Sequence, residues 1–380
     1  MIYLDSAATT AVRREVLEAM WPYLTGDFGN PSSTHSLGER AADALAEARA
    51  SVARALGVRA NEIVFTSGGT EADNLAIKGI ALANPRGRHL ITTPIEHEAV
   101  LESCDYLRRH HGFTVSFLGV NREGLVDPDE FERLLTPETT LASIMYANNE
   151  IGTIQPLAEL AARAQAARVP LHTDAVQAAG WLSLNVRALG VDALTISGHK
   201  LGAPKGIGAL YVRGRLALEP VLHGGGQERG ARSGTENVAA AVGLATALNL
   251  AEATREADAA RVSALRDEFI GTVLREVADA RLTGPAEHRL PGLASFCFTT
   301  TSGESVLLEL ERQGIVCSSG SACAAGSDEP SHVLVAVGYE PEIAQTAVRF
   351  TMGSSVTAAE LHEAAAAVKS AVEAVRGIAR

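Results

Sequence analysis

The sequence predicts an α/β protein with a mainly parallel central sheet, helices on both faces of that sheet, and a second, smaller α/β domain. Through the first two-thirds of the chain, short apolar runs rich in β-branched residues alternate with amphipathic stretches. Near-continuous apolar runs are typical of strands covered on both faces, and their alternation with helices is typical of a parallel sheet. A long helical passage then leads into another α/β set.

The individual elements are expected in the following order. Residues 37–56 place apolar side chains at helical spacing. Seven strand candidates come next, at 62–66, 89–93, 114–118, 141–147, 169–173, 193–197 and 208–212. After the helical passage at 239–277, strand-like or helical runs occur at 293–300, 304–314 and 347–353, followed by an alanine-rich helix. We therefore predict a large domain of residues 11–250 and a small domain that joins residues 1–10 to 251–380.

Composition narrows the class of protein. The chain has 380 residues, 46% of them hydrophobic, and a mean hydropathy of +0.08, which is enough apolar material for a sizeable core. The net charge of −12 argues against nucleic-acid binding. The first residues lack the pattern of a secretory signal, and no apolar run is long enough for a membrane span, so we expect a cytoplasmic protein. Four cysteines do not form a disulfide framework.

Polar residues follow several of the predicted strands, where open parallel sheets bind ligands. The run Ser67-Gly68-Gly69-Thr70 separates a strand from a helix. Backbone N–H groups at such a helix start suit a phosphate, although a tight turn capped by Thr70 is the simpler alternative.

Other strands end in residues that have ordinary explanations one at a time. These are His97, Asn148, Asp174 with Gln177, and the run Ser197-Gly198-His199-Lys200. Together with the phosphate turn they are the set that pyridoxal 5′-phosphate needs. A lysine holds its aldehyde, an acid keeps its pyridine nitrogen protonated, and an imidazole stacks on its ring. Lys205 competes with Lys200 for the first role, but its neighbours Pro204 and Gly206 predict a rigid loop.

Nine motifs then occur in the order found in a known family: LDSAATT, GNPSSTHSLGE, FTSGGTEADNLAI, EHEAVLESC, YANNEIG, HTDAVQAAG, SGHKLGAPKGIGALYVR, RSGTENV and SSGSAC. From Tyr3 to about Gly353 the chain resembles the pyridoxal-phosphate-dependent cysteine desulfurases of the class-V aminotransferase family. Within them it is similar to the long-loop group that serves iron–sulfur cluster assembly and nitrogenase maturation. The resemblance implies the fold type I of pyridoxal-phosphate-dependent transferases and a homodimer.

The resemblance also implies roles at the cofactor. Lys200 would bind the cofactor aldehyde and move the α-proton of the substrate, Asp174 would pair with the pyridine nitrogen, and Gln177 would contact the phenolic oxygen. His97 would stack on the ring. The phosphate would be held by Gly69, Thr70, Ser197 and His199, and by Thr235 of the partner subunit.

At the substrate, the resemblance implies that Asn148 lies near both cofactor and L-cysteine, that Asn30 lies at the pocket edge, and that Arg349 binds the carboxylate. Cys323 would be the nucleophile. It would take the sulfur as a persulfide, release L-alanine and pass the sulfur to an iron–sulfur scaffold or another acceptor protein. The Gly/Ser/Ala-rich composition of residues 317–332 suits a loop that moves between pocket and acceptor.

Some assignments stay open at this level. A free thiol has a pKa of about 8.5, so Cys323 needs a proton acceptor, either His97 or the cofactor region. Cys323 is also a candidate for a transient iron–sulfur ligand. Cys317 follows an apolar run and is either a buried strand-end residue or a second sulfur carrier. Alternative functions are a selenocysteine lyase, another lyase or an aminotransferase of the same fold, or a non-catalytic sulfur-binding or cluster-binding scaffold.

Overall fold

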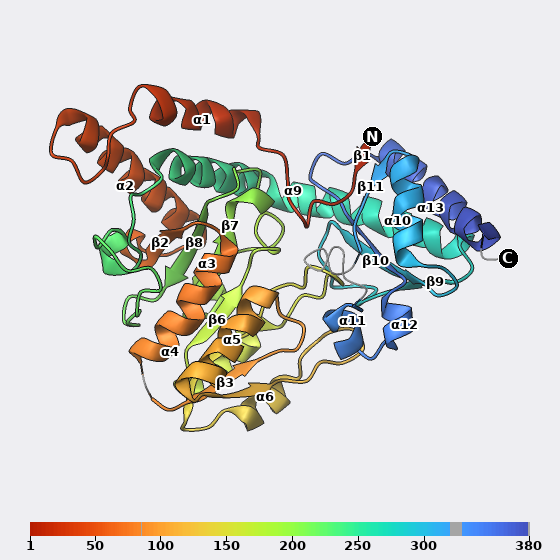
Figure 1. Ribbon diagram of the computed structural model, residues 1–380, viewed down its shortest axis with the longest axis horizontal. Coiled ribbons are helices and arrows are strands. Elements are labelled where there is room, and N and C mark those ends of the chain that lie inside the picture. The colour runs from red at the N-terminus through yellow and green to blue at the C-terminus, as the bar shows by residue number, and fades with distance from the viewer. Residues whose placement is uncertain (85, 320–328, 379–380) are drawn as a thin grey trace.

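A computed structural model describes residues 1–84, 86–319 and 329–378. Two lobes lie side by side, and one long helix, α9 (Val238–Glu276), runs through both of them (Figure 1). The larger lobe is built on a seven-stranded sheet and the smaller on a three-stranded sheet. The α/β class that the sequence predicts is confirmed.

The large sheet contains all seven predicted strands. They are β2 (Ile63–Thr66), β3 (His89–Thr92), β4 (Thr114–Phe117), β5 (Thr139–Ser143), β6 (Leu171–Asp174), β7 (Ala193–Ser197) and β8 (Gly208–Val212). Their order across the sheet is β2-β8-β7-β6-β5-β3-β4. The pairings from β7 to β4 are parallel, and only β8 runs against its two neighbours.

Both faces of this sheet are covered, as the apolar runs predict. Along β2, Ile63 and Phe65 join one core cluster, whereas Val64 between them joins another on the opposite face. This is the alternation that the two-residue period of a strand imposes. The surrounding helices are α1 (Arg14–Thr25), α2 (Ser36–Leu56), α3 (Gly69–Asn74), α4 (Ile80–Ala83), α5 (Glu98–His111), α6 (Pro128–Leu134), α7 (Leu157–Ala166) and α8 (Val186–Leu189).

The small lobe combines the two ends of the chain. Its sheet has the order β12-β10-β9, and a separate pair joins β1 to β11 in parallel. The strands are β1 (Ile2–Tyr3), β9 (Ala280–Leu282), β10 (Leu293–Phe298), β11 (Ile315–Val316) and β12 (Ala347–Thr351). The helices are α10 (Gly303–Arg312), α11 (His332–Ala336), α12 (Pro341–Ala344) and α13 (Ala358–Ile378).

Helix α9 shows where packing changes from one lobe to the other. Its residues up to Ala251 are buried in the large-domain core, and its residues from Val262 on are buried with Phe296 and Phe350 of the small domain. Ile2 and Leu4 also belong to the small-domain core. The domain limits 11–250 and 1–10 with 251–380 stay a prediction, and this packing supports them. Among the described residues, no helix is both long enough and apolar enough to cross a membrane.

Candidate active site

A cavity of about 510 Å³ lies where the carboxyl ends of the parallel strands face the small domain. Side chains from separate elements converge on it, as the strand-end argument predicts. Nine of the predicted site residues line it: Gly69, Thr70, His97, Asp174, Gln177, Ser197, His199, Lys200 and Arg349. All except Arg349, on β12, come from the ends of large-sheet strands or the turns that follow them.

The turn after β2 has the shape of a cradle. A Cβ atom on Gly69 would lie 2.9 Å from Cγ2 of Val176 and 3.4 Å from Cβ of Ser197, so a side chain at this position would collide with its neighbours. Ser197 and His199 approach from the end of β7 and line the same cavity. An amide-rich turn without side-chain bulk, opposite a hydroxyl group, fits a phosphate.

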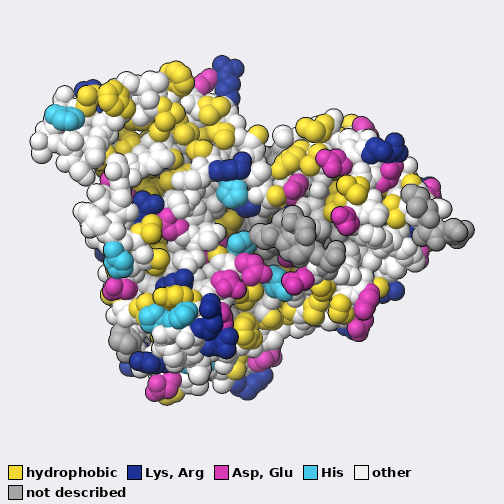
Figure 2. Space-filling view, in the orientation of Figure 1, with side chains coloured by type: hydrophobic (Ala, Val, Ile, Leu, Met, Phe, Trp, Pro, Cys, Tyr) yellow, Lys and Arg dark blue, Asp and Glu magenta, His cyan; other side chains and the backbone are white. Residues whose placement is uncertain are grey.

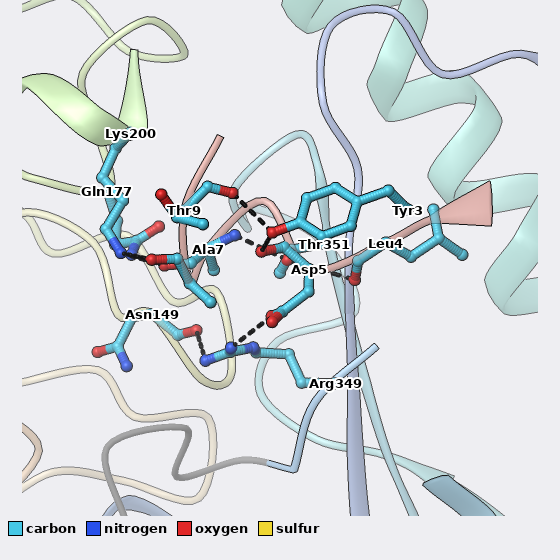
Figure 3. Close-up of polar contacts among 11 residues, drawn as sticks. Tyr3, Leu4, Asp5, Ala7, Thr9, Asn149, Gln177, Lys200, Arg349 and Thr351 are labelled. Atoms are coloured by element: carbon cyan, nitrogen blue, oxygen red, sulfur yellow. Dashed lines mark hydrogen bonds and ion pairs between the residues drawn. The ribbon is translucent and has the colours of Figure 1, made fainter. Parts of the chain in front are cut away.

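Lys200 is held by the backbone of the N-terminal segment. Its Nζ donates hydrogen bonds to the carbonyl oxygens of Ala7 at 2.5 Å and Ala8 at 2.7 Å, and Nε2 of Gln177 donates to the same Ala7 oxygen at 3.1 Å (Figure 3). The competing Lys205 is exposed and borders a second, larger cavity of about 870 Å³, which Lys200 also lines. Of the two lysines, Lys200 is the one that lines the candidate site.

Two histidines, His97 and His199, line the site. His97 caps α5, because its Nδ1 accepts a hydrogen bond from the Ala99 N–H at 3.1 Å, and its ring also lines the cavity. The cap and the site role are therefore compatible. Burial, with the nearby charges of Lys200 and Lys205, lowers the pKa of His199 to about 4. The imidazole of His199 is thus neutral at pH 7.

Three carboxyl groups meet at the floor of the cavity: Asp73, Glu96 and Asp174. Burial raises the pKa of all three, and Asp73 and Asp174 influence each other. At Asp174 the effect of burial is opposed by His97, by the Val176 N–H at 2.8 Å and by Lys200. At Glu96 burial raises the pKa to about 8 in spite of hydrogen bonds from the Met145 N–H and the Thr93 hydroxyl. Because neighbouring buried carboxyls do not all ionise together, we infer that the negative charge resides on Asp174.

The chemical groups that line the cavity match those that pyridoxal phosphate needs. Asp73 Oδ1 and Glu96 Oε2 are buried in the cavity wall without a hydrogen-bond partner. Asp174 is a buried acid that a protonated ring nitrogen would satisfy. The cradle at Gly69 and the amine of Lys200 suit the phosphate and the aldehyde.

Asn148 lies outside the cavity, contrary to the expectation from sequence. Its side chain is fully buried; Nδ2 donates to Ile95 O at 2.9 Å, and Oδ1 accepts from the N–H groups of Glu150 at 2.8 Å and Ile151 at 2.9 Å. These bonds stabilise the turn after β5. The next residue, Asn149, lines the cavity instead. The doublet Asn148-Asn149 was the sequence signal, and only the turn geometry separates the two.

Arg349 is the largest fully buried side chain, at 1% exposure, and it reaches the cavity from β12. Its Nη2 lies 3.0 Å from Oδ1 of Asp5, and its Nη1 donates to Asn149 O at 3.1 Å (Figure 3). Asp5 was not singled out from the sequence, although the LDSAATT motif contains it.

The remaining predicted residues lie elsewhere. Asn30 and Thr235 are exposed and do not line this cavity in their own subunit. Cys323 lies outside the described residues. Cys317 is partly buried at the end of β11, and burial with the nearby Asp5 raises the pKa of its thiol to about 12. That value favours the buried strand-end interpretation.

Cys104 and Cys297 are core residues, and burial raises their pKa values to about 12 and about 11. Within residues 1–84, 86–319 and 329–378, no group of three or more His, Cys, Asp or Glu side chains is arranged to hold a metal ion.

Comparison with known proteins identifies what the chain is similar to. The family model described as Aminotransferase class-V matches residues 2–363. A protein of Dictyoglomus turgidum named Cysteine desulfurase IscS is 47% identical over 378 residues, covering 99% of this chain and 96% of that protein. A solved structure described as a NifS-like protein superimposes with a TM-score of 0.90 at 36% identity, covering 97% of this chain and 98% of the other. A structure of SspA in complex with cysteine gives a TM-score of 0.82 at 37% identity, with 93% and 99% coverage.

Glu96 generates a testable pH dependence. Burial raises its pKa in the folded state to about 8, so the folded protein binds a proton there that the unfolded chain, with an ordinary glutamate pKa, releases near pH 4.5. Stability attributable to this group is therefore full below about pH 4.5 and declines as pH rises to about 8, by at most about 1.4 kcal/mol per pH unit. Glu96→Gln, which mimics the neutral acid, removes this decline.

The measurement is the unfolding midpoint of both proteins from pH 5 to pH 9. We expect wild type to lose stability relative to Glu96→Gln as pH rises, while Glu102→Gln, at an exposed position on α5, the helix that follows Glu96, keeps the wild-type profile. Parallel profiles for wild type and Glu96→Gln would show that Glu96 is ionised in the folded protein.

Proposed function

We propose a route for sulfur through this chain, which belongs to the class-V aminotransferase family as a pyridoxal-phosphate-dependent cysteine desulfurase. In this route L-cysteine yields L-alanine and a persulfide on Cys323, and the sulfur then goes to iron–sulfur cluster assembly or another acceptor protein. The observation that carries the proposal is the convergence of a lysine amine, a buried acid and an arginine on one cavity. That set suits an amino-acid substrate held beside pyridoxal phosphate.

The residues proposed to hold the cofactor are those that line the cavity. Gly69, Thr70, Ser197 and His199 hold the phosphate, Asp174 the pyridine nitrogen, Gln177 the phenolic oxygen, His97 the ring face and Lys200 the aldehyde. When bound, pyridoxal phosphate draws electrons from the α-carbon of the substrate, which labilises the bond from its β-carbon to sulfur. We assign the neighbouring amide contact to Asn149, because Asn148 is occupied by the turn.

Each remaining step falls to a side chain of this protein. Arg349 binds the α-carboxylate through its guanidinium, and Lys200 moves the α-proton. The carbonyl oxygens of Ala7 and Ala8 offer Lys200 Nζ a fixed resting position in the cavity. A thiolate at Cys323 attacks the substrate sulfur; the S–S bond forms as the carbon–sulfur bond breaks, and the carbon fragment takes up a proton to leave as L-alanine. His97 is the proposed acceptor of the Cys323 proton.

The direct test is intact-mass analysis, without reductant, after brief exposure of the cofactor-loaded protein to L-cysteine. We expect one added sulfur, mapped by proteolysis to Cys323, and one equivalent of L-alanine. Cys323→Ala should lose the added sulfur and at least 100-fold of the turnover, on the order of what removal of a nucleophile costs. Cys317→Ala is the matched control and should keep both.

Persulfide on Cys317 in place of Cys323, or L-alanine without any persulfide, would contradict this route. The same variants examine the proposed transient iron–sulfur ligation by Cys323. Iron-dependent absorbance on mixing with a scaffold protein should disappear in Cys323→Ala, and its persistence there would remove Cys323 from that role.

Asn149 and Asn148 make a matched pair. Asn149→Ala should weaken cofactor binding by roughly 2- to 12-fold, the value of one hydrogen bond, without lowering the stability of the cofactor-free protein. Asn148→Ala should instead lower that stability by about 1–3 kcal/mol, because it leaves buried backbone groups unpaired. Cofactor titration by absorbance and urea unfolding distinguish the two effects. Reversal of this pattern would return the cofactor contact to Asn148.

A homodimer is part of the proposal and is supported by the surface of α1. Val16 and Met20 of this helix are buried in the large-domain core. On the same helix Leu17, Trp21 and Leu24 remain 54%, 66% and 58% exposed, and Phe28 just beyond it is 65% exposed. Figure 2 shows hydrophobic side chains gathered over this part of the molecule. A helix that is apolar on two sides is usually buried in an assembly.

The segment before α9 also fits a role in a partner. Arg232 forms an ion pair with Glu71 at 2.8 Å, and the N–H of Gly234 donates to Oε1 of Gln227 at 2.9 Å. These contacts hold the exposed Thr235 on a fixed turn, outside the cavity of its own subunit. We propose that Thr235 completes the phosphate site of the partner subunit.

Sedimentation analysis tests the dimer. We expect the wild-type mass to be twice that of the chain, and Trp21→Glu to shift it toward the monomer with a parallel loss of bound cofactor. Leu308→Glu, at a position 62% exposed in the small domain, is the control and should stay dimeric. A wild-type monomer with full cofactor content would contradict both the dimer and the role of Thr235.

We further propose a cytoplasmic location. The free thiols of Cys104, Cys297 and Cys317 suit a reducing compartment.

A further inference from the structure

Asp5 is the acidic residue in direct contact with the buried guanidinium of Arg349. The Asp5 Oδ1 to Arg349 Nη2 distance is 3.0 Å, and the two side chains are 17% and 1% exposed. A cation withdrawn from water to this degree needs a partner with good geometry. The partners come from two sides, since Arg349 Nη1 donates to the backbone oxygen of Asn149 at 3.1 Å. The guanidinium is thus oriented by two segments at once.

Glu150 is a second described acid that lies close enough to influence Arg349 electrostatically, but its carboxyl group is engaged elsewhere. The hydroxyl of Ser331 donates to Glu150 Oε2 at 2.5 Å. Burial raises the pKa of Glu150, which favours its neutral form. Among the residues that the structure describes, Asp5 is therefore a carboxylate that supplies negative charge at contact distance from Arg349.

The backbone around Asp5 is fixed, so its carboxylate has a defined position. Thr351, two residues from Arg349, donates its N–H to Leu4 O at 2.7 Å and accepts from the Ser6 N–H at 3.1 Å and, through its hydroxyl, from the Ala7 N–H at 2.8 Å. The Tyr3 hydroxyl donates to Asp5 O at 3.0 Å (Figure 3). Asp5 and Arg349 are thus set on two chain segments in fixed register.

We propose that Asp5 is a positioning residue for substrate recognition. It orients the Arg349 guanidinium so that the guanidinium can bind the α-carboxylate of the substrate. This inference rests on the proposed role of Arg349 as carboxylate-binding group. Two of the guanidinium nitrogens have their directions set by Asp5 and Asn149, so the plane of the fork is set before substrate arrives. A preorganised fork binds a carboxylate without losing further side-chain freedom.

The inference predicts selectivity for the carboxylate and not a general gain in binding. L-Alanine and ethylamine form a matched pair of probes, because they share the amine and the two-carbon skeleton and differ by the carboxylate alone. Their apparent dissociation constants are measured on the cofactor-loaded protein from the change in cofactor absorbance. The ratio of the two constants reports the contribution of Arg349 and its positioning.

For Asp5→Ala we expect the dissociation constant of L-alanine to rise about tenfold or more, the size of a hydrogen bond to a charged group, while that of ethylamine stays within about twofold. Asp5→Asn keeps an oxygen beside Nη2 and has the same shape, so it should lose less than Asp5→Ala. It also provides a folded variant if Asp5→Ala proves unstable. Cofactor content and unfolding midpoint are recorded for each variant.

The matched control is Asp267→Ala. Asp267 pairs with Arg266 at 2.6 Å, and Arg266 is likewise buried and donates to a backbone oxygen, that of Leu290, at 2.8 Å, but neither residue lines the cavity. This variant removes a carboxylate from a buried arginine elsewhere in the small domain. It should leave the L-alanine to ethylamine ratio unchanged.

Arg349→Ala separates failure of this inference from failure of the proposed function. If Arg349→Ala loses the preference for L-alanine and Asp5→Ala keeps it, Asp5 has no positioning role and the inference is overturned. Equal weakening of both probes by Asp5→Ala would likewise overturn it, because that is the result of a purely structural defect. If Arg349→Ala itself keeps the preference, the carboxylate role of Arg349 is wrong, and the role of Asp5 falls with it.

Discussion

The contacts of one N-terminal segment join the two halves of the site. Residues 2–6 pair with β11 and β12 of the small domain through backbone hydrogen bonds, and the Ala7 N–H donates to the hydroxyl of Thr351. The carbonyl oxygens of Ala7 and Ala8 hold Lys200 from the large domain, and the carboxylate of Asp5 holds Arg349 from the small one. The proposed chemistry needs the amine and the guanidinium at a set separation, because both must act on a single amino acid. This segment supplies that separation.

Electrostatics imposes the second constraint. Asp73, Glu96 and Asp174 are buried close together, and their burial disfavours the charged form of each. A site in which all three were ionised would be strongly unfavourable. Favourable electrostatic interactions with His97 and Lys200 favour the charged form of Asp174. A protonated ring nitrogen would therefore meet a carboxylate that is already charged, at Asp174. Because Asp73 and Glu96 are neutral, they do not compete with Asp174 for that positive charge.

Most residues of the site could be predicted from the sequence, and the exceptions have physical reasons. Eight of the nine predicted residues that line the cavity follow strands of the large sheet, and the carboxyl ends of parallel strands meet at one edge; the ninth, Arg349, comes from within β12. Asn148 fails this logic because consecutive residues of a turn point in different directions, and its amide is used by the turn itself. Asp73 and Glu96 were not predicted because an acid within a helical or turn segment has no sequence feature that marks it as buried. Thr235 and Asn30 lie outside the cavity of their own subunit.

The sequence by itself determined the α/β class, the seven strands of the large sheet and the family, because apolar periodicity and strand-end motifs are local properties of the chain. It also predicted that residues 1–10 join the small domain, but it did not determine which charges these residues neutralise. Asp5 and Arg349 are 344 residues apart, and Lys200 and Ala7 are 193 apart. Such pairs form only when the folded chain brings the N-terminal segment beside β12 and beside Lys200. Tertiary structure alone decided them, because burying a charge requires a partner in space, wherever in the sequence it comes from.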